Sequence, residues 1–358
     1  MIPKTITVIG GGIAGLSSAL YLSQLGYQVT IIEKNTCGAA ASRVAAGMLA
    51  PINELEFTEM DMLSIGIQSR KMYEQWEALL GNIGIERTGT LEVAANADDV
   101  PYLLRLFDFQ LQQGLDVQLL KGDEIHSLEP AIASHINTAI YAPLDIQVDN
   151  RLLCQKIKEF LVNAGVVIAE NEEFVQWQQA PQGLTIQTIH RTLQTDALLL
   201  CTGAYQSQLA QANALPSIVP VKGEMLMLNT SPDFELKHVV RIRNRVLGNG
   251  YIVPKKQGIV VGASAEYQGF HPGFKMGNIM DILRRAWHVV PGLYDLDIAE
   301  MYTGFRPAAE NHRPLTDKIP DVPVFYLNGL YRHGILLGPW AGNEIASRMH
   351  QYLNPSSS

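Results

Sequence analysis

The sequence predicts an α/β protein built from two interleaved domains, and three observations support this prediction. A strand, a glycine turn, a helix and a second strand follow one another over residues 5–34. Strand-like and helix-like segments then continue along the rest of the chain. At 358 residues, the chain is also long for one domain and of a suitable length for two.

The first of these elements are defined by hydrophobic periodicity. A β-branched run over 6–9 ends at Gly10 and predicts a buried strand. Apolar residues between 13 and 21 recur at helical spacing. Residues 28–32 form a second apolar run, which is closed by the carboxylate of Glu33. The segment therefore predicts one βαβ-type unit at the start of the chain.

The glycines of this unit form a dinucleotide-binding fingerprint, GxGxxG. Gly10 allows the tight turn, Gly12 lets the backbone approach a pyrophosphate, and Gly15 lets the helix pack on the strand. The free N–H groups at the helix N-terminus would then face the phosphates. Glu33 lies where a carboxylate accepts hydrogen bonds from a ribose diol, and it would repel a 2′-phosphate. The unit predicts a Rossmann-like nucleotide site that disfavours NADP.

The remaining elements follow from amphipathic patterns and turn residues. Gly114 and Gly165 end predicted helices, and Pro339 stands at a favoured first helical position. The predicted helices cover 51–80, 100–114, 149–164, about 277–289 and 338–352. Strands are predicted within 89–95, 166–170, 173–177, 184–189, 197–203 and 323–329, and residues 221–305 are rich in strands.

Composition excludes several classes of function. The chain is 47% hydrophobic with a net charge of −8, and it lacks a run of Lys and Arg, so nucleic-acid binding is not expected. Cys37, Cys154 and Cys201 are scattered without a CxxC motif, which favours a reducing cytoplasm over a disulfide framework. The histidines lack HxH and HExxH spacing, so no metal site is expected. No apolar run is long enough to predict a membrane span.

The fingerprint alone does not distinguish FAD from NAD. Residues 200–209 and 260–269 lack GxGxxG spacing, so no second nucleotide site is predicted. If the nucleotide is FAD, its reductant is then expected to be the substrate itself. Residues 37–51, CGAAASRVAAGMLAP, are almost all small and carry one charge, which favours a segment that lies close against a flat group.

Four segments resemble glycine oxidase, the ThiO-type branch of the D-amino-acid oxidase superfamily. GAAASRVAAGMLAP is similar to that family's flavin loop, and VKGEMLML (221–228) resembles the first strand of its substrate domain. GYIVPKKQGIVVGASAEYQGF (250–270) resembles the next strand pair. TGFRPAAENHRPL (303–315) and NGLYRHGILLGP (328–339) together resemble the C-terminal signature. The likeness touches both ends and the middle of the chain in the family's order.

The resemblance implies a fold and a domain layout. The fold would be a Rossmann-like FAD-binding domain of the glutathione-reductase-like, D-amino-acid oxidase type, with an inserted antiparallel β-sheet substrate domain. The FAD-binding domain would comprise 1–85, 145–220 and 306–358, and the substrate domain 86–144 and 221–305.

The same resemblance implies three catalytic residues. Arg306, in GFRP, would clamp the substrate carboxylate, because a guanidinium is a planar fork that grips a carboxylate in bidentate fashion. Arg332 matches a position near both substrate and flavin, where it would serve either the substrate or the cofactor. Tyr251 matches a tyrosine whose hydroxyl helps to hold the carboxylate, although a strand tyrosine also suits core packing.

The cofactor contacts implied by the resemblance extend over the whole chain. They are Gly10, Gly12, Ile13, Ala14, Gly15, Glu33, Lys34, Ala41, Ser42, Ala46, Gly47, Met48, Val175, Leu330, Tyr331, Arg332, His333, Gly334, Ile335 and Leu336. His333 stands where the family commonly has asparagine, and Leu330 where histidine is frequent, so the exact substrate stays open. No cysteine lies near the C-terminal flavin segment, so FAD is expected to be non-covalent.

The implied reaction is oxidative deamination of a small, glycine-like amino acid or amine. A neutral amine needs no general base, because its Cα hydrogen can leave as hydride to the flavin. The imine would hydrolyse to a keto acid and ammonia, and molecular oxygen would yield hydrogen peroxide. Alternatives are an amino-acid dehydrogenase, a sarcosine- or proline-type secondary-amine oxidase, an NAD-dependent dehydrogenase and a non-catalytic flavin-binding protein. A link to thiamine synthesis follows only from the likeness, and a homo-oligomer stays open beside a monomer.

Overall fold

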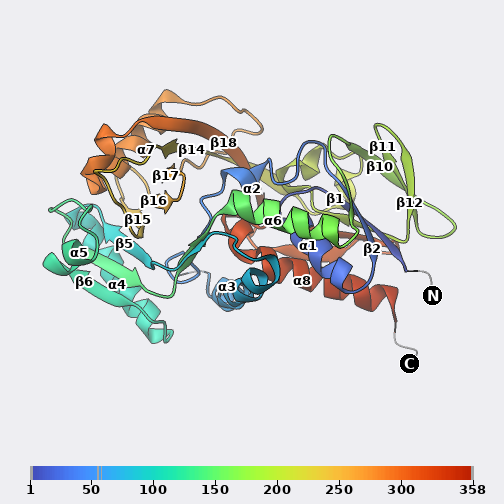
Figure 1. Ribbon diagram of the computed structural model, residues 1–358, viewed down its shortest axis with the longest axis horizontal. Helices are drawn as coiled ribbons and strands as arrows, with labels where there is room; N and C mark the ends of the chain where they lie inside the picture. Colours follow the sequence, from blue (N-terminus) through green and yellow to red (C-terminus); the bar gives the residue numbers. More distant parts are fainter. Residues whose placement is uncertain (1–2, 55, 58, 356–358) are drawn as a thin grey trace.

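The computed structural model describes residues 3–54, 56–57 and 59–355. Two large sheets lie toward opposite ends of the long axis, with helices packed between and around them (Figure 1). This arrangement confirms the predicted α/β fold class. Among the described residues, none of the helices combines the length and the apolar character needed to cross a bilayer.

The N-terminal strand lies inside a six-stranded sheet. The strand order is β19 (Leu315–Lys318), β20 (Val324–Asn328), β13 (Ala197–Leu200), β1 (Thr5–Ile9), β2 (Gln28–Ile32) and β9 (Val167–Ala169). All neighbours pair in parallel except β19 and β20. The central strands are apolar on both faces, as expected for a parallel sheet covered on both sides.

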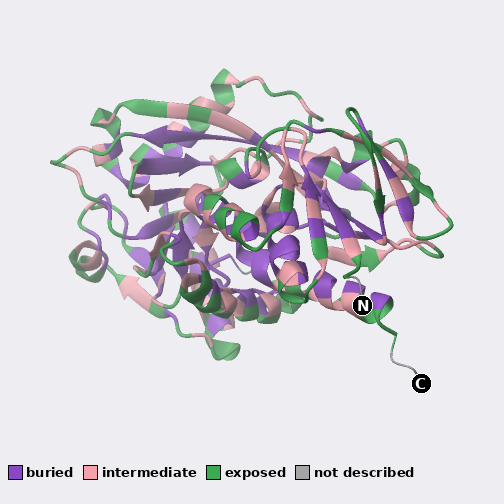
Figure 2. Cartoon of the chain, turned by 45° about the vertical axis from the view of Figure 1, so that its right-hand side comes forward, coloured by how far each residue is buried: buried purple, intermediate pink, exposed green. Residues whose placement is uncertain are grey.

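Helices from distant parts of the chain pack together beside this sheet. The helix α1 (Ile13–Gln24) contacts both α6 (Asn150–Asn163) and α8 (Gly334–Leu353), and α8 contacts α3 (Met60–Leu80). Asp149 caps α6 by accepting hydrogen bonds from the backbone N–H groups of Arg151 and Leu152, each at 3.0 Å. The buried residues run as a continuous core through this part of the molecule (Figure 2).

The second large sheet has eight strands. Their order is β18 (Ile298–Ala309), β14 (Ile218–Leu228), β17 (Gly258–Gly262), β16 (Gly250–Lys255), β15 (Val239–Arg243), β5 (Thr90–Ala94), β7 (Thr138–Ala142) and β6 (Gln118–Lys121). The sheet is antiparallel except for β5 and β15, which pair in parallel. These two strands come from separate stretches of chain, so no hairpin forces them to run in opposite directions. The helices α4 (Val100–Gln112), α5 (Asp123–Leu128) and α7 (Met276–Val289) accompany this sheet.

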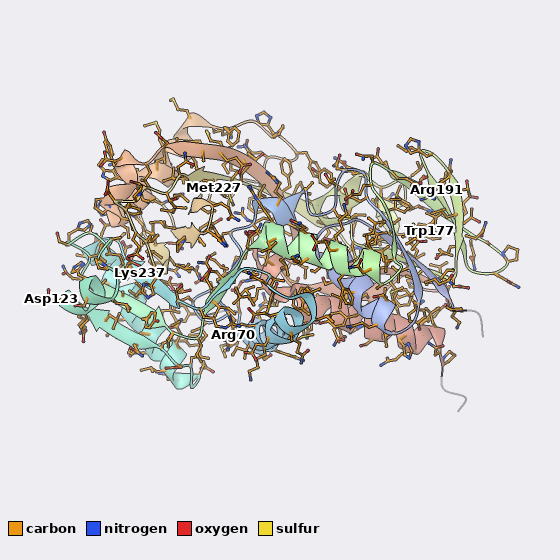
Figure 3. The ribbon with its side chains drawn as sticks, in the orientation of Figure 1. Arg70, Asp123, Trp177, Arg191, Met227 and Lys237 are labelled. Atoms are coloured by element: carbon orange, nitrogen blue, oxygen red, sulfur yellow. The ribbon has the colours of Figure 1, made fainter. Side chains whose placement is uncertain are left out.

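Two small sheets complete the fold. The strands β10 (Phe174–Gln179), β11 (Leu184–Thr188) and β12 (Thr192–Thr195) form an antiparallel meander, which Trp177 and Arg191 mark in Figure 3. The strands β3 (Met48–Leu49), β8 (Ile146–Val148) and β4 (Ile85–Glu86) form the other. The short helix α2 (Ala41–Val44) precedes β3.

Two predicted helix starts are wrong. The helix predicted over 51–80 begins at Met60, and residues 51–54 form turns; positions 55 and 58 lie outside the described residues. The last helix begins at Gly334, so Pro339 lies inside it. Proline has no N–H to bond the carbonyl four residues earlier. Here the Tyr73 hydroxyl donates to that carbonyl, of Ile335, so the helix continues through Pro339.

Candidate active site

A cavity of about 670 Å³ is lined by residues from both large sheets. It extends from the glycine turn after β1, along the small-residue segment 39–48, to residues 330–335 and the face of the eight-stranded sheet. Its volume is typical of a ligand or cofactor site. The cavity therefore brings together segments that lie more than 300 residues apart in the sequence.

The glycine fingerprint forms one end of this cavity. Gly10 has φ +103°, a conformation that favours glycine. A Cβ on Gly15 would overlap the carbonyl oxygen of Gly10, so this third glycine provides the close helix–strand approach that the motif predicts. Gly10 and Gly12 line the cavity, whereas Gly15 does not.

Two side chains fix the shape of this end. Glu33 accepts hydrogen bonds from the backbone N–H groups of Gly11 at 2.7 Å and Asn35 at 2.9 Å. Each carboxylate oxygen can still accept a second bond, so a ribose hydroxyl can be added. The Ser42 hydroxyl accepts from the Ile13 N–H at 2.9 Å, which ties the small-residue segment to the start of α1.

Most of the sequence-predicted cofactor residues line this one cavity. They are Gly10, Gly12, Ile13, Ala14, Glu33, Lys34, Ala41, Ser42, Ala46, Gly47, Met48, Val175, Leu330, Tyr331, Arg332, Gly334 and Ile335. Gly15, His333 and Leu336 do not line it. Because α8 begins at Gly334, the free backbone N–H groups of its first turn lie at the cavity wall and favour a negative charge there.

Arg306 enters the opposite part of the cavity from β18. It lies across Gly223 of β14, where a Cβ would be only 2.5 Å from its Nη1 atom. The guanidinium donates from Nη1 to the carbonyl oxygen of Ser264 at 3.1 Å, and it also interacts with the Tyr251 hydroxyl. Arg306 forms no ion pair with any described carboxylate. A partly buried guanidinium without an acid partner is well suited to receive a ligand carboxylate.

Tyr251 lies beside Arg306 on the cavity wall. Its ring covers Gly262, where a Cβ would approach the ring atoms to 2.6 Å. Burial raises the pKa of Tyr251, and the nearby charge of Arg306 offsets part of this rise. Tyr251 therefore remains a neutral phenol that can donate a hydrogen bond to a carboxylate held by Arg306.

Arg332 also lines the cavity, but it is already paired. Its Nη2 atom contacts the Glu59 carboxylate and donates to the carbonyl oxygen of Glu54, the latter at 3.2 Å. Burial lowers the pKa of Arg332, but the carboxylates of Glu54 and Glu59 outweigh it and raise the pKa overall. The guanidinium is therefore held in place with its charge largely compensated.

His333 points away from the main cavity. Its Nδ1 atom lies 3.0 Å from Glu54 Oε2, and its Nε2 atom is buried without a partner in the described part of the chain. Beside the ring lies a separate cavity of about 10 Å³, lined in part by Glu54, Glu59 and Leu336. This space is about the size of one water molecule, which could satisfy Nε2.

A group of charged and polar residues on the cavity wall was not predicted from the sequence. They are Glu54, Glu56, Arg241 and Asn249. Burial alone would raise the pKa of Glu54. A hydrogen bond with His333 and the charges of His333, Arg241 and Arg332 outweigh this effect and lower the pKa overall, so the carboxyl is ionised. No local motif marks these residues, because strand pairing and folding of 50–54 bring them together. The one local signal is that Arg241 and Arg243 are two residues apart on a strand, which places both side chains on the same face of the sheet.

The lining of the cavity fits FAD. Thr202, at the end of β13, has a buried hydroxyl that finds no partner among the described residues and faces this space. Small residues over 39–47 leave room for a flat group. Residues 10–14, 33–34 and 41–48 would hold the nucleotide and the flavin, and residues 330–335 would complete the flavin site.

The fold and this site define a flavin-dependent oxidoreductase. Residues 5–348 match the model of the DAO family, described as FAD dependent oxidoreductase, and the chain belongs to this family. It is therefore an enzyme that uses FAD, as the sequence predicted.

Known relatives extend the comparison over nearly the whole chain. A glycine oxidase of Geobacillus kaustophilus is 29% identical over 350 residues, which cover 95% of this chain and 91% of that protein. A bifunctional protein ThiO/ThiG of a Nostoc species is 31% identical over 361 residues, covering 96% of this chain and 52% of that protein, so the chain spans about half its length. The crystal structure of glycine oxidase from Geobacillus kaustophilus superposes with a TM-score of 0.90 at 29% identity, covering 97% of this chain and 95% of that one.

Proposed function

We propose that this enzyme oxidatively deaminates a small, glycine-like amino acid or amine. The observation that supports this most directly is Arg306, an acid-free guanidinium in the wall of the flavin cavity. A substrate carboxylate bound there would also reach the phenol of Tyr251. The similarity to glycine oxidases over nearly the full length supports the same substrate class.

In this proposal, the chain contributes orientation and electrostatics. When FAD is bound, it would accept the two electrons of the Cα–H bond that is broken. Arg306 and Tyr251 hold the substrate carboxylate, which leaves Cα directed toward the flavin segment 330–335. Orientation of this kind can lower a barrier by about 7–11 kcal/mol. The free N–H groups at the start of α8 would favour negative charge on a flavin held at this wall of the cavity.

Several further features belong to the same proposal. Molecular oxygen is the final acceptor, with hydrogen peroxide as a product, and FAD is held without a covalent bond. The FAD-binding domain comprises 1–85, 145–220 and 306–358, and the substrate domain comprises 86–144 and 221–305. The enzyme acts in the cytoplasm, as a monomer or a homo-oligomer. A thiamine biosynthesis oxidoreductase ThiO, named as putative in Rhizobium etli, is 30% identical over 350 residues and supports a role in that pathway.

One experiment tests the substrate class and the acceptor together. The purified yellow protein is mixed without oxygen with glycine, sarcosine, D-amino acids and L-proline, and the flavin absorbance at about 450 nm is followed. We expect bleaching by glycine or a close analogue, and hydrogen peroxide once oxygen is admitted. Bleaching without peroxide would indicate a dehydrogenase. A flavin that no amine reduces would refute the proposed function.

A further inference from the structure

Three arginines, Arg241, Arg306 and Arg332, line the cavity, and Arg243 lies two residues after Arg241 on β15. Two of these four arginines are paired with carboxylates. Arg332 contacts Glu59, and Arg243 bonds Glu92 at 2.5 Å and Glu56 at 3.3 Å. Arg306 and Arg241 have no carboxylate within 4.0 Å among the described residues. Both of these acid-free arginines line the cavity.

Arg241 shares a face of the sheet with the carboxylate site. It lies on β15 directly opposite Tyr251 of β16, and directly opposite residues on neighbouring strands point to the same face. Asn249, two residues before Tyr251, also lines the cavity and is exposed. In strand order, Arg241 on β15 lies on the far side of Tyr251 on β16 from Arg306 on β18.

The nearby carboxylates of Glu54 and Glu56 form no ion pair with Arg241 among the described residues. Burial raises the pKa of Glu54 and Glu56, and Arg241 is one of several cations that lower it, so its charge reaches both carboxylates. However, Glu54 bonds His333, and Glu56 bonds Arg243 and Tyr102. Arg241 itself donates from Nη1 to the carbonyl oxygen of Asn53, which anchors the side chain. Its other N–H groups have no hydrogen-bond partner among the described residues.

We propose that Arg241 forms a second anion subsite and that the preferred substrates are amino acids with a second carboxylate. This inference rests on the proposed function, because it uses Arg306 as the site of the first carboxylate. The second carboxylate, on the side chain or on a nitrogen substituent, lies against Arg241 and the Asn249 amide. A guanidinium that is anchored in advance loses little freedom on binding, so it discriminates strongly between one acid group and two.

The test compares two ligands that differ by one acid group. Succinate and butyrate are each titrated into the FAD-loaded protein, and binding is followed by the change in flavin absorbance. We expect succinate to bind about ten- to hundredfold more tightly, as for a charge-assisted hydrogen bond in a partly buried site. Equal binding of the two acids by the unaltered protein would overturn the proposal without any variant.

Two variants assign the effect to one side chain. Arg241→Gln should weaken succinate binding much more than butyrate binding, so the preference for succinate should be lost. Arg245→Gln removes the same charge from an exposed residue four positions further on, outside the cavity, and should keep the preference. A preference that survives Arg241→Gln, or one that disappears equally in both variants, would contradict the subsite.

Substrates provide a readout that separates this inference from the proposed function. Both enantiomers of aspartate and of 2-aminobutyrate are tested for anaerobic flavin bleaching. Faster bleaching by an aspartate, lost in Arg241→Gln, supports the subsite. Bleaching by neutral amino acids with no preference for aspartate overturns the subsite alone. An unreduced flavin with every amine, together with tight succinate binding, overturns the proposed function and leaves the anion subsite standing.

Discussion

Two missing Cβ atoms shape the substrate end of the cavity. Gly223 lets Arg306 cross the strand β14, and Gly262 lets the Tyr251 ring lie flat on β17. Neither glycine has a positive φ, so backbone freedom does not explain them. Their role is to leave space for two large side chains on one face of the sheet.

The carboxylate role proposed for Arg306 predicts a defect confined to substrate binding. We expect Arg306→Ala to raise KM about ten- to hundredfold, because it removes charge-assisted hydrogen bonds worth about 1.5–3 kcal/mol. FAD content should not change. Steady-state kinetics and the flavin spectrum give both quantities.

Arg306→Lys is the matched control for charge. A lysine keeps the positive charge but loses the planar fork, so its KM should lie between those of the unaltered enzyme and Arg306→Ala. Loss of FAD from the alanine variant would contradict the assignment, because it would place Arg306 in the cofactor site.

Gly223→Ala should reproduce much of this defect without touching Arg306 itself. The new methyl group would lie 2.5–2.7 Å from the guanidinium atoms and must displace them. We expect a higher KM with an unchanged flavin spectrum, measured by the same kinetics. Gly277→Ala in α7 meets no atom within 4 Å and is the control. A KM equal to that of the unaltered enzyme would show that Arg306 need not lie over Gly223 to bind substrate.

Among the helices, α8 depends on α3 for its continuity. Ser69 donates to the Leu336 carbonyl at 2.7 Å and accepts from the Trp340 N–H at 3.2 Å, so its hydroxyl is inserted into the hydrogen-bond ladder of α8. The Tyr73 hydroxyl donates to the Ile335 carbonyl, which Pro339 leaves without its usual partner. The helix thus passes through a proline at the flavin segment because a neighbouring helix replaces the lost bonds.

Ser69→Ala should therefore destabilise the protein. It leaves two buried backbone groups unsatisfied, and we expect the free energy of unfolding to fall by about 1–3 kcal/mol. Denaturant titration measures the change. Ser64→Ala, on the exposed face of the same helix, should have an effect within about 0.5 kcal/mol. If the two variants are equally stable, the Ser69 hydroxyl is not needed for α8.

This pair of helices also shows how far the sequence can predict the structure. The elements β1, α1 and β2 were predicted correctly because their periodicity and glycines are local signals. The start of α8 was predicted incorrectly, because the hydroxyls that let the helix continue through Pro339 belong to residues about 270 positions earlier in the chain. Arg306 and Tyr251 were predicted through family motifs, and both line the cavity. Arg241 and Glu54 were missed because isolated charges acquire a site only when strands pair.

In the molecule as a whole, segment 50–54 is bonded to the eight-stranded sheet at Thr90 and Arg241, and to the turn between β7 and β8. Asp145 lies in that turn, fully buried, and accepts hydrogen bonds from the backbone N–H groups of Ile52 at 3.2 Å and Asn53 at 2.9 Å. Burial raises the pKa of Asp145 to about 7, and these bonds and the charge of Arg70, on α3 in Figure 3, offset only part of the rise.

This buried acid should give stability an unusual dependence on pH. In the unfolded chain Asp145 would have a pKa of about 3.9, so between pH 4 and 7 the folded state holds a proton that the unfolded state has lost. The contribution is therefore fully present below about pH 4 and is lost as the pH rises through 7, by up to about 1.4 kcal/mol per pH unit. Most paired carboxylates have a lowered pKa in the folded state, so their contribution to stability is instead lost as the pH falls.

Asp145→Asn should remove this dependence. The amide does not titrate, so the difference in unfolding free energy between the unaltered protein and the variant should be largest near pH 4 and shrink toward pH 8. Denaturant titrations at several pH values measure it. Asp123→Asn, at the exposed site labelled in Figure 3, should give a small difference that does not follow this trend. If the Asp145→Asn difference instead grows as the pH rises, Asp145 is ionised in the folded state, and its bonds to 52 and 53 are those of a carboxylate.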